Sequence, residues 1–251
     1  MRAAARALRG ARQVVVVTGA GMSRESGIPT FRDALTGLWA RYDPEELATE
    51  AAFRRDPARV FGWYVWRWRL VRAAAPHPGY HALVALERLV PELTIVTQNV
   101  DGLHRRVGSR RVLELHGSLE RFSCVDARHP FPADAVPEPA ADAACEPPRC
   151  LRCGSAVRPD VVWFGEMLPE RVTAEAWDLA AACQVMLVVG TSGLVQPAAQ
   201  LPYIARDAGA TVIEVNLAPT EVSAAAHIVC RGPAGAMLPA LVAALTEGES
   251  T

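Results

Sequence analysis

The sequence predicts an α/β protein in which a doubly wound parallel sheet carries a smaller lobe built from two insertions. Three observations predict it. Short apolar runs rich in β-branched residues recur along the chain, helical stretches lie between several of them, and two segments interrupt this alternation. The 251 residues, 51% hydrophobic and 21% charged, suffice for one large domain or two unequal ones and exclude wholesale disorder.

Five runs are predicted as strands because each is short and apolar enough to be buried on both faces of a parallel sheet. The first, residues 14–18, follows a predicted N-terminal helix and ends in glycines. The others span residues 94–97, 112–115, 185–189 and 211–215. Helices are predicted over residues 80–89, 170–182 and 197–208, so that helices cover both faces of the sheet.

The two interrupting segments are predicted to form the smaller lobe together. Residues 32–78 are expected to be helices with loops, and residues 119–159 contain a cysteine pair and many prolines, which prevent regular structure. The larger domain then comprises residues 1–31, 79–118 and 160–251. A cleft between the two lobes is the expected ligand site.

Charge and hydropathy exclude several classes of partner. A net charge of -1 leaves no strong field for holding nucleic acid or an anionic membrane, and no apolar run is long enough to span a bilayer. The arginine-rich start has the composition of a transit peptide, but the apolar run after it is too short for a secretory signal. A cytoplasmic protein is therefore expected, with a monomer as the default state.

A glycine-rich turn follows the first predicted strand. Gly19-Ala20-Gly21 lies where a pyrophosphate could meet backbone N–H groups at a helix N-terminus, although a simple tight turn is nearly as good an interpretation. Arg24 occupies the place of the third glycine of the dehydrogenase fingerprint, and no strand ending in an acid follows about 20 residues later. A hydride-transfer enzyme is therefore disfavoured.

Five ordered blocks carry a more specific resemblance. They are residues 19–32, residues 97–104, His116-Gly117-Ser118, residues 161–166 and Gly190-Thr191-Ser192. Together they resemble the sirtuin family, the NAD-dependent protein deacylases. The resemblance implies a Rossmann-like NAD-binding domain with a helical insertion and a zinc-binding insertion, which agrees with the layout predicted above.

The resemblance implies that NAD contacts the loops at the strand ends. Asn99 and Asp101 would position the ribose and the nicotinamide amide, although Asp101 also suits the N-cap of the following helix. For the later turns, ordinary turn chemistry remains an alternative. The implied cofactor-binding set is Gly19, Ala20, Gly21, Ser23, Gly27, Ile28, Pro29, Phe31, Arg32, Gln98, Asn99, Val100, Asp101, Gly190, Thr191, Ser192, Asn216, Leu217 and Ala234.

His116 is the predicted general base, and with Asn99 and Asp101 it forms the predicted catalytic set. It follows the strand 112–115 at an edge where a histidine can equally be a hydrogen-bonded core residue. An ordinary pKa near 6.5 suits proton transfer at neutral pH. In sirtuins the matching histidine activates a ribose hydroxyl, and the resemblance implies that role for His116.

Two apolar segments are implied to sandwich an extended substrate peptide, although ordinary sheet edges would look the same. Their predicted substrate-binding residues are Val161, Trp163, Phe164, Gly165, Glu166, Gly193, Leu194 and Val195. Tyr64 and Arg67 share a face of a predicted helix. The pair resembles the Tyr-x-x-Arg of the sirtuin branch that removes succinyl, malonyl and glutaryl groups and binds their carboxylate. A half-buried amphipathic helix explains the two residues too. Ala48 falls where that branch keeps a small residue.

The metal site departs from the family pattern of two Cys-x-x-Cys pairs. Cys150 and Cys153 form one pair, but Cys124 has Ala127 where its partner should be. Cys145 is the expected replacement, and Asp126 and His129 are poorer candidates. We expect a structural zinc on Cys124, Cys145, Cys150 and Cys153, with loss of the metal as the alternative.

The resulting hypothesis is an NAD-dependent protein-lysine deacylase that removes acetyl and acidic acyl groups and yields nicotinamide and 2′-O-acyl-ADP-ribose. An ADP-ribosyltransferase using the same NAD site is the alternative. A zinc hydrolase is rejected because the cysteines lie in a proline-rich insertion without a nearby His-Glu pattern.

Overall fold

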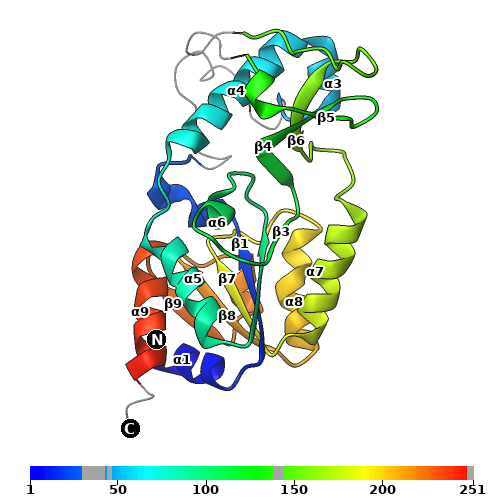
Figure 1. Cartoon of the computed structure of the whole chain (residues 1–251). Helices are drawn as coiled ribbons and strands as arrows, with labels where there is room; N and C mark the ends of the chain where they lie inside the picture. The colour runs from blue at the N-terminus through cyan, green and yellow to red at the C-terminus, as the bar shows by residue number, and fades with distance from the viewer. Residues whose placement is uncertain (30–42, 44–46, 138–143, 248–251) are drawn as a thin grey trace.

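The computed structural model describes residues 1–29, 43, 47–137 and 144–247, and Figure 1 shows the course of the chain. The helices within these ranges are α1 (Arg2–Arg9), α3 (Glu50–Arg55), α4 (Pro57–Ala73), α5 (Pro78–Leu89), α6 (Leu103–Arg106), α7 (Glu170–Ala182), α8 (Leu201–Asp207) and α9 (Ala234–Thr246). The strands are β1 (Gln13–Thr18), β2 (Glu92–Thr97), β3 (Val112–Glu114), β4 (Gly117–Cys124), β5 (Pro130–Phe131), β6 (Val157–Val161), β7 (Val185–Val189), β8 (Thr211–Asn216) and β9 (Ile228–Arg231).

The larger sheet has six parallel strands in the order β3-β2-β1-β7-β8-β9. This is the strand order of the Rossmann fold, with its switch point between β1 and β7. The predicted α/β fold with a doubly wound parallel sheet is therefore confirmed. Ligands of such sheets bind outside the carboxyl ends of the strands at the switch point.

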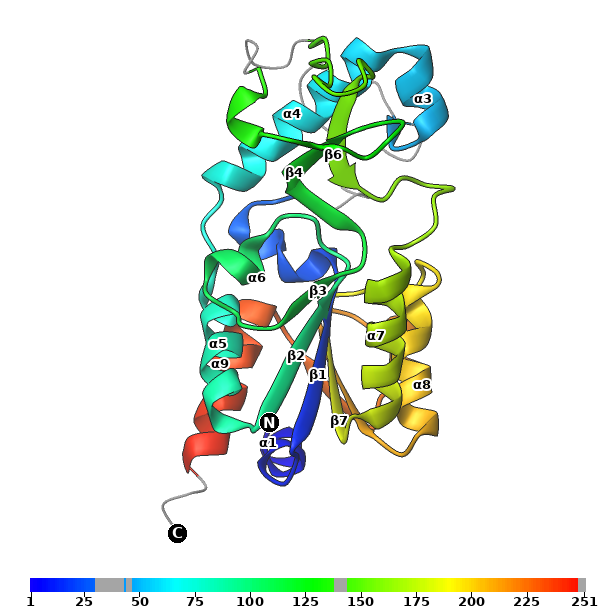
Figure 2. The same cartoon turned by 45° about the vertical axis from the view of Figure 1, so that its right-hand side comes forward.

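β1 separates two hydrophobic cores. Because successive side chains of a strand point to opposite faces, Val14 and Val16 join the core with α1, α5 and α9, whereas Val15 and Val17 join the core with α7 and α8. Figure 2 shows the two groups of helices on either side of the sheet. The apolar run of β1 is explained by this burial on both faces.

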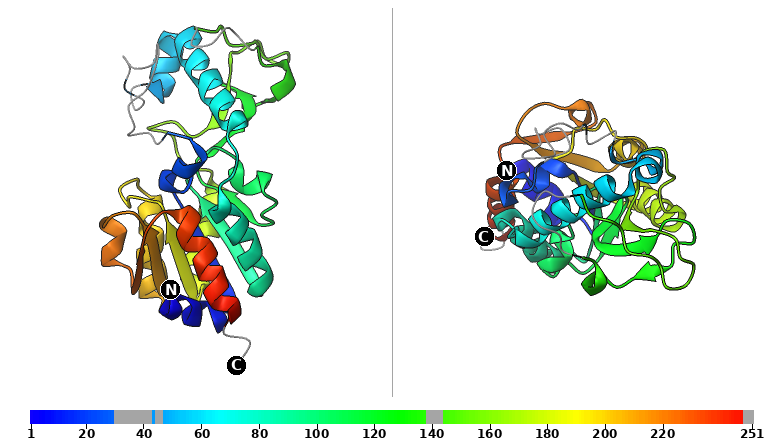
Figure 3. Two further views of the ribbon diagram at one scale, coloured as in Figure 1. Left: turned by 90° about the vertical axis from the view of Figure 1, so that its left-hand side faces the viewer. Right: turned by 90° about the horizontal axis from the view of Figure 1, so that it is seen from above.

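The smaller lobe holds a three-stranded antiparallel sheet in the order β5-β4-β6, against which α4 packs. Its core joins aromatic side chains from distant segments, among them Trp63 and Trp68 of α4, Phe122 of β4 and Trp163 after β6. Figure 3 shows this lobe stacked on one end of the larger domain. β4 begins at Gly117 and β6 ends at Val161, so the small sheet extends beyond the predicted limits 119 and 159. The domain limits themselves stay a prediction.

Several element boundaries differ from the sequence prediction. β3 ends at Glu114, and His116 lies in the turn between β3 and β4 rather than at a strand end. The helix predicted from residue 197 begins at Leu201, with Pro202 in its first turn where no N–H is needed. The sequence does not predict β9, since its apolar run, Ile228-Val229-Cys230, is only three residues long. Among the described residues, no helix is long and apolar enough to cross a membrane.

Candidate active site

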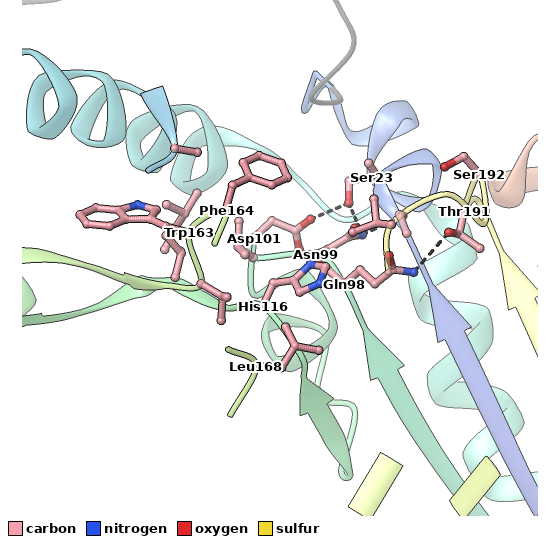
Figure 4. A pocket seen from close by; sticks show the side chains of 18 of the residues that line it. Ser23, Gln98, Asn99, Asp101, His116, Trp163, Phe164, Leu168, Thr191 and Ser192 are labelled. Carbon is pink, nitrogen blue, oxygen red and sulfur yellow. Dashed lines mark hydrogen bonds between the residues drawn. The ribbon is translucent and has the colours of Figure 1, made fainter. Parts of the chain in front are cut away.

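A cavity of about 1530 Å³ lies at the carboxyl ends of the parallel strands and is lined by residues of both lobes. Figure 4 shows its polar side chains, with Ser23, Gln98, Asn99, Asp101 and His116 close together and Thr191 and Ser192 beyond them. The larger sheet supplies these polar groups, whereas the smaller lobe supplies mainly apolar and aromatic side chains. The cavity is therefore polar on the side of the larger sheet and mainly apolar on the side of the smaller lobe.

Three glycines allow the loops after β1 and β7 to touch at the switch point. The N–H of Gly21 donates to the carbonyl of Gly190 at 2.8 Å, and a Cβ on Gly21 would lie 2.7 Å from that oxygen. A Cβ on Gly19 would lie 2.7 Å from the Cβ of Thr191. The N–H groups of the three glycines are bonded within the protein, so what the glycines give the cavity is backbone free of side chains that a ligand can approach closely, here called the glycine cradle.

Asn99 and Asp101 are held by a buried hydrogen-bond network centred on Ser23. The Asn99 amide donates to the Gly19 carbonyl at 3.0 Å and to the Ser23 hydroxyl at 2.9 Å, and Ser23 donates to Asp101 at 2.5 Å. The other Asp101 oxygen accepts from the N–H of Leu103, the first residue of α6, at 2.9 Å, but the N-cap position of this helix is Gly102 and not Asp101. Burial raises the pKa of Asp101, although these hydrogen bonds oppose the shift.

The geometry around His116 fixes which ring nitrogen can accept a proton. Nδ1 lies 3.0 Å from the carbonyl oxygen of Gln98. Since a carbonyl only accepts, Nδ1 carries the hydrogen and Nε2 keeps its lone pair. Burial lowers the pKa of His116, and the bond to Gln98 offsets part of this shift. His116 lines the cavity and is therefore poised to take up a proton at neutral pH.

At the far end of the cavity, the loops after β7 and β8 are tied together. The Asn216 amide donates to the Thr191 carbonyl at 2.8 Å, and the Thr191 hydroxyl accepts from the Gln98 amide at 3.2 Å. Four residues of the predicted cofactor and substrate sets do not line the cavity, namely Gly27, Gly193, Leu217 and Ala234. Phe31 and Arg32 lie outside the described residues.

The predicted peptide-binding segment lines the cavity with alternating side chains. Phe164 is 48% exposed, whereas Trp163 is 1% exposed and points into the smaller lobe. The N–H of Phe164 donates to the Ala48 carbonyl at 2.9 Å, so Ala48 contacts this segment through its backbone. Leu194 and Val195 are exposed in the cavity lining. The two segments therefore present exposed apolar side chains to the cavity, and their pairing with an extended peptide stays a prediction.

Tyr64 and Arg67 line the cavity from α4, as their spacing predicts. The Arg67 guanidinium lies 4.9 Å from the centre of the Trp63 ring and 5.9 Å from that of Tyr64. Burial lowers the pKa of Arg67 and raises the pKa of Tyr64 to about 12, so Tyr64 keeps its hydroxyl hydrogen at neutral pH. A guanidinium beside a phenol can bind a carboxylate by charge-assisted hydrogen bonds.

A second group of side chains in the smaller lobe has the arrangement of a metal site. Cys124, His129, Cys150 and Cys153 bring their ligand atoms within 4.8 Å of one another. Cys124 Sγ lies 3.6 Å from Cys153 Sγ, and Cys150 Sγ lies 3.6 Å from His129 Nδ1. In a tetrahedral site with Zn–S bonds of about 2.3 Å, two sulfurs lie about 3.8 Å apart. The four residues thus fit zinc, and since none lines the cavity the metal would be structural.

Cys145, the expected fourth ligand, is not part of this group, and His129 takes its place. The N–H of Cys124 donates to the His129 carbonyl at 2.9 Å, and Arg128 adopts a left-handed conformation (φ 52°) that closes the turn. This tight turn returns His129 to the cysteines. Cys145 is buried in the aromatic core of the lobe, with its N–H bonded to the Ala58 carbonyl at 2.8 Å.

Comparison with known proteins decides the family. The model of the Sir2 family matches residues 19–197, most of the chain and all the loops from Gly19 to Val195 described above. The chain belongs to the Sir2 family. The resemblance to sirtuins is thereby confirmed.

The Sir2 relatives include an NAD-dependent protein deacylase of Pseudomonas aeruginosa, 52% identical over 96% of this chain and 98% of the relative. A crystal structure of a Sir2 homologue in complex with NAD has a TM-score of 0.92 and 42% identity, with 100% of this chain and 95% of that chain covered. A Sir2 protein bound to an acetylated peptide has a TM-score of 0.83 and 29% identity, with 98% and 97% covered. The likeness therefore extends over both lobes.

Sequence reasoning missed several members of this Sir2 site. Tyr80 of α5 is fully buried and its hydroxyl lies 2.9 Å from Ser23 Oγ, so it supports the network around Asp101. Leu168, Trp177 and Thr220 line the cavity. Their side chains carry no local signal in the sequence, because only the packing of distant elements brings them to the site.

Proposed function

We propose that this Sir2-family protein is an NAD-dependent protein-lysine deacylase that removes acetyl groups and acidic acyl groups, succinyl or malonyl, from lysine side chains. The observation that carries the proposal is the position of His116. Its unprotonated Nε2 belongs to the same cavity as the glycine cradle and the two segments predicted to bind a peptide. A base, a glycine cradle and a peptide slot in one cavity are the parts that this reaction needs.

The residues present fit NAD. The cradle of Gly19, Gly21 and Gly190 suits the pyrophosphate, Thr191 and Asn216 offer polar groups for the adenosine ribose, and Asn99 and Asp101 lie beside His116 for the nicotinamide ribose. When bound, NAD would supply the ribose that accepts the acyl group as nicotinamide leaves. Asn99 and Asp101 orient the reacting groups, and their buried network holds them in place before substrate arrives.

His116 acts as the general base in this proposal. Its Nδ1 hydrogen is held by the Gln98 carbonyl, which fixes the ring so that Nε2 can take the proton of a ribose hydroxyl. Because burial lowers the pKa of His116, the ring is neutral and ready to accept a proton at neutral pH.

Tyr64 and Arg67 give the proposed preference for acidic acyl groups. An acetyl group offers these side chains nothing to bind, whereas a succinyl or malonyl carboxylate can meet the phenol and the guanidinium together. Ala48 is small and 3% exposed, and it lines the same region of the cavity. We further propose a monomer. A reducing compartment such as the cytoplasm is also proposed, because the thiolates of a zinc group need to stay reduced.

The test follows nicotinamide release from NAD in the presence of acetyl-lysine and succinyl-lysine peptides, with peptide products identified by mass. We expect release that depends on peptide and NAD together, and its loss in His116→Ala. Arg67→Met should reduce desuccinylation far more than deacetylation. Equal losses on both peptides would refute the acyl assignment, and transfer of ADP-ribose to protein without deacylation would favour the alternative transferase.

A further inference from the structure

We propose that Trp163 determines the acyl specificity of this protein by orienting the Tyr64 hydroxyl toward the acyl carboxylate. The inference rests on the proposed removal of acidic acyl groups and adds a positioning residue to it. The indole N–H of Trp163 donates to the Tyr64 oxygen at 2.9 Å, and both side chains are buried.

The direction of this hydrogen bond decides what Tyr64 can do. An indole nitrogen only donates, so the Tyr64 oxygen must accept and its own hydrogen must point elsewhere. Tyr64 lines the cavity, and within the described ranges no acceptor is found for that hydrogen. Because burial raises the pKa of Tyr64 to about 12, the hydrogen is present at neutral pH. A carboxylate placed beside Arg67 would supply the missing acceptor.

Trp163 is itself held on three sides. The Arg158 guanidinium lies 3.2 Å from the centre of its ring, and the Phe53 ring lies 5.2 Å away. The backbone N–H of Trp163 donates to the Glu166 carboxylate at 2.8 Å, and the same carboxylate is paired with Arg158. The ring therefore packs against an arginine that a buried ion pair holds in place, and this packing restricts the position of the indole N–H.

The segment that holds Trp163 and Phe164 thereby contacts both the peptide backbone of the substrate and, through Tyr64, its acyl group. Side chains alternate along it, so Phe164 faces the cavity where a peptide would lie, while Trp163 reaches Tyr64 inside the lobe. Figure 4 shows the Phe164 ring on the side of the polar side chains and the Trp163 indole turned away from His116. A peptide that binds along this segment therefore places its acyl group at a pocket in which Trp163 has already oriented the Tyr64 hydroxyl.

The test measures kcat and KM on succinyl- and acetyl-lysine peptides for Trp163→Phe, Tyr64→Phe and the double variant. Trp163→Phe should raise KM for the succinyl peptide about five- to tenfold, the scale expected for a weakened hydrogen bond to a charged group, and raise KM for the acetyl peptide by a clearly smaller factor. The double variant should be no worse than Tyr64→Phe, because both remove the same interaction.

Trp68→Phe is the matched control. Trp68 belongs to the same aromatic core and loses the same volume, and its indole nitrogen has no hydrogen-bond partner among the described residues. It should affect both peptides alike. Should Trp163→Phe fold poorly, benzothienylalanine at this position keeps the bicyclic ring and replaces the N–H by sulfur, and it should give the same selective rise in KM.

Three results would overturn the inference. An equal loss on both peptides, as for Trp68→Phe, would reduce Trp163 to a packing residue. Losses from Trp163→Phe and Tyr64→Phe that add in the double variant would show that they act independently. A wild-type protein that deacetylates but leaves succinyl-lysine intact would refute the acidic-acyl proposal first and this inference with it, whereas the first two results leave the proposed function standing.

Discussion

The buried ion pair between Arg158 and Glu166 makes the sharpest prediction about stability. The Arg158 side chain is 0% exposed and that of Glu166 is 16% exposed. One Glu166 oxygen lies 3.0 Å from Arg158, and Glu166 also accepts from the N–H of Trp163 and from Arg128 at 2.9 Å. Glu166→Ala would leave a buried guanidinium without its carboxylate and the Trp163 N–H without its acceptor.

The expected loss is about 3 kcal/mol, at the lower end of the range for breaking a buried pair because water can reach Glu166 in part. For a chain of this length the midpoint of thermal unfolding should fall by roughly 6 to 12 °C. Glu175→Ala is the control, since Glu175 is 38% exposed and its partner Arg111 is 48% exposed. That variant should lose at most about 1 kcal/mol. Similar losses in the two variants, measured by calorimetry and urea unfolding, would refute the reasoning.

The same pair predicts a dependence on pH. Burial alone would raise the pKa of Glu166. The effect of burial is outweighed by the hydrogen bond and charge of Arg158 and by the hydrogen bond from the Trp163 N–H, so the pKa of Glu166 is lowered. A carboxyl group whose pKa is lowered on folding stabilises the fold above its unfolded pKa and loses that contribution as the pH falls through the folded value. The gap in stability between wild type and Glu166→Ala should therefore narrow in acid, and a constant gap would contradict the assignment.

Three further predictions concern the base, the metal group and the glycine cradle. Because burial lowers the pKa of His116, kcat/KM should stay level through pH 7 and fall only below the ordinary histidine value of about 6.5; a fall that begins above pH 7 would contradict this. His129→Ala should lose bound zinc while Cys145→Ser retains it, as measured by mass spectrometry of the isolated proteins; the reverse result would restore Cys145 as the ligand. Gly21→Ala should raise the Kd for NAD at least tenfold in calorimetric titration, because its Cβ would press against the Gly190 carbonyl, and unchanged binding would exclude a tight cradle there.

Local pattern was enough to predict five of the six strands of the larger sheet. The strand runs at residues 14–18 and 185–189 match β1 and β7 within one residue, because a strand buried on both faces must be apolar throughout. The loops of Gly19, Gln98 and Gly190 could be placed in one site because the carboxyl ends of parallel strands share one edge of the sheet. The end of β3 and the existence of β9 depend on tertiary contacts, so the local sequence pattern could not predict them.

The order of apolar runs and motifs in the sequence by itself determined the fold class, the placing of Gly19 and His116 at one cavity, and the positions of Tyr64 and Arg67 on one helix face. The tertiary structure alone decided that His129 joins the cysteines in place of Cys145 and that Trp163 meets Tyr64, 99 positions away in the chain. The physical reason is that strands and helices follow from local periodicity, whereas the partner of a buried polar group depends on which turn closes and which faces pack together.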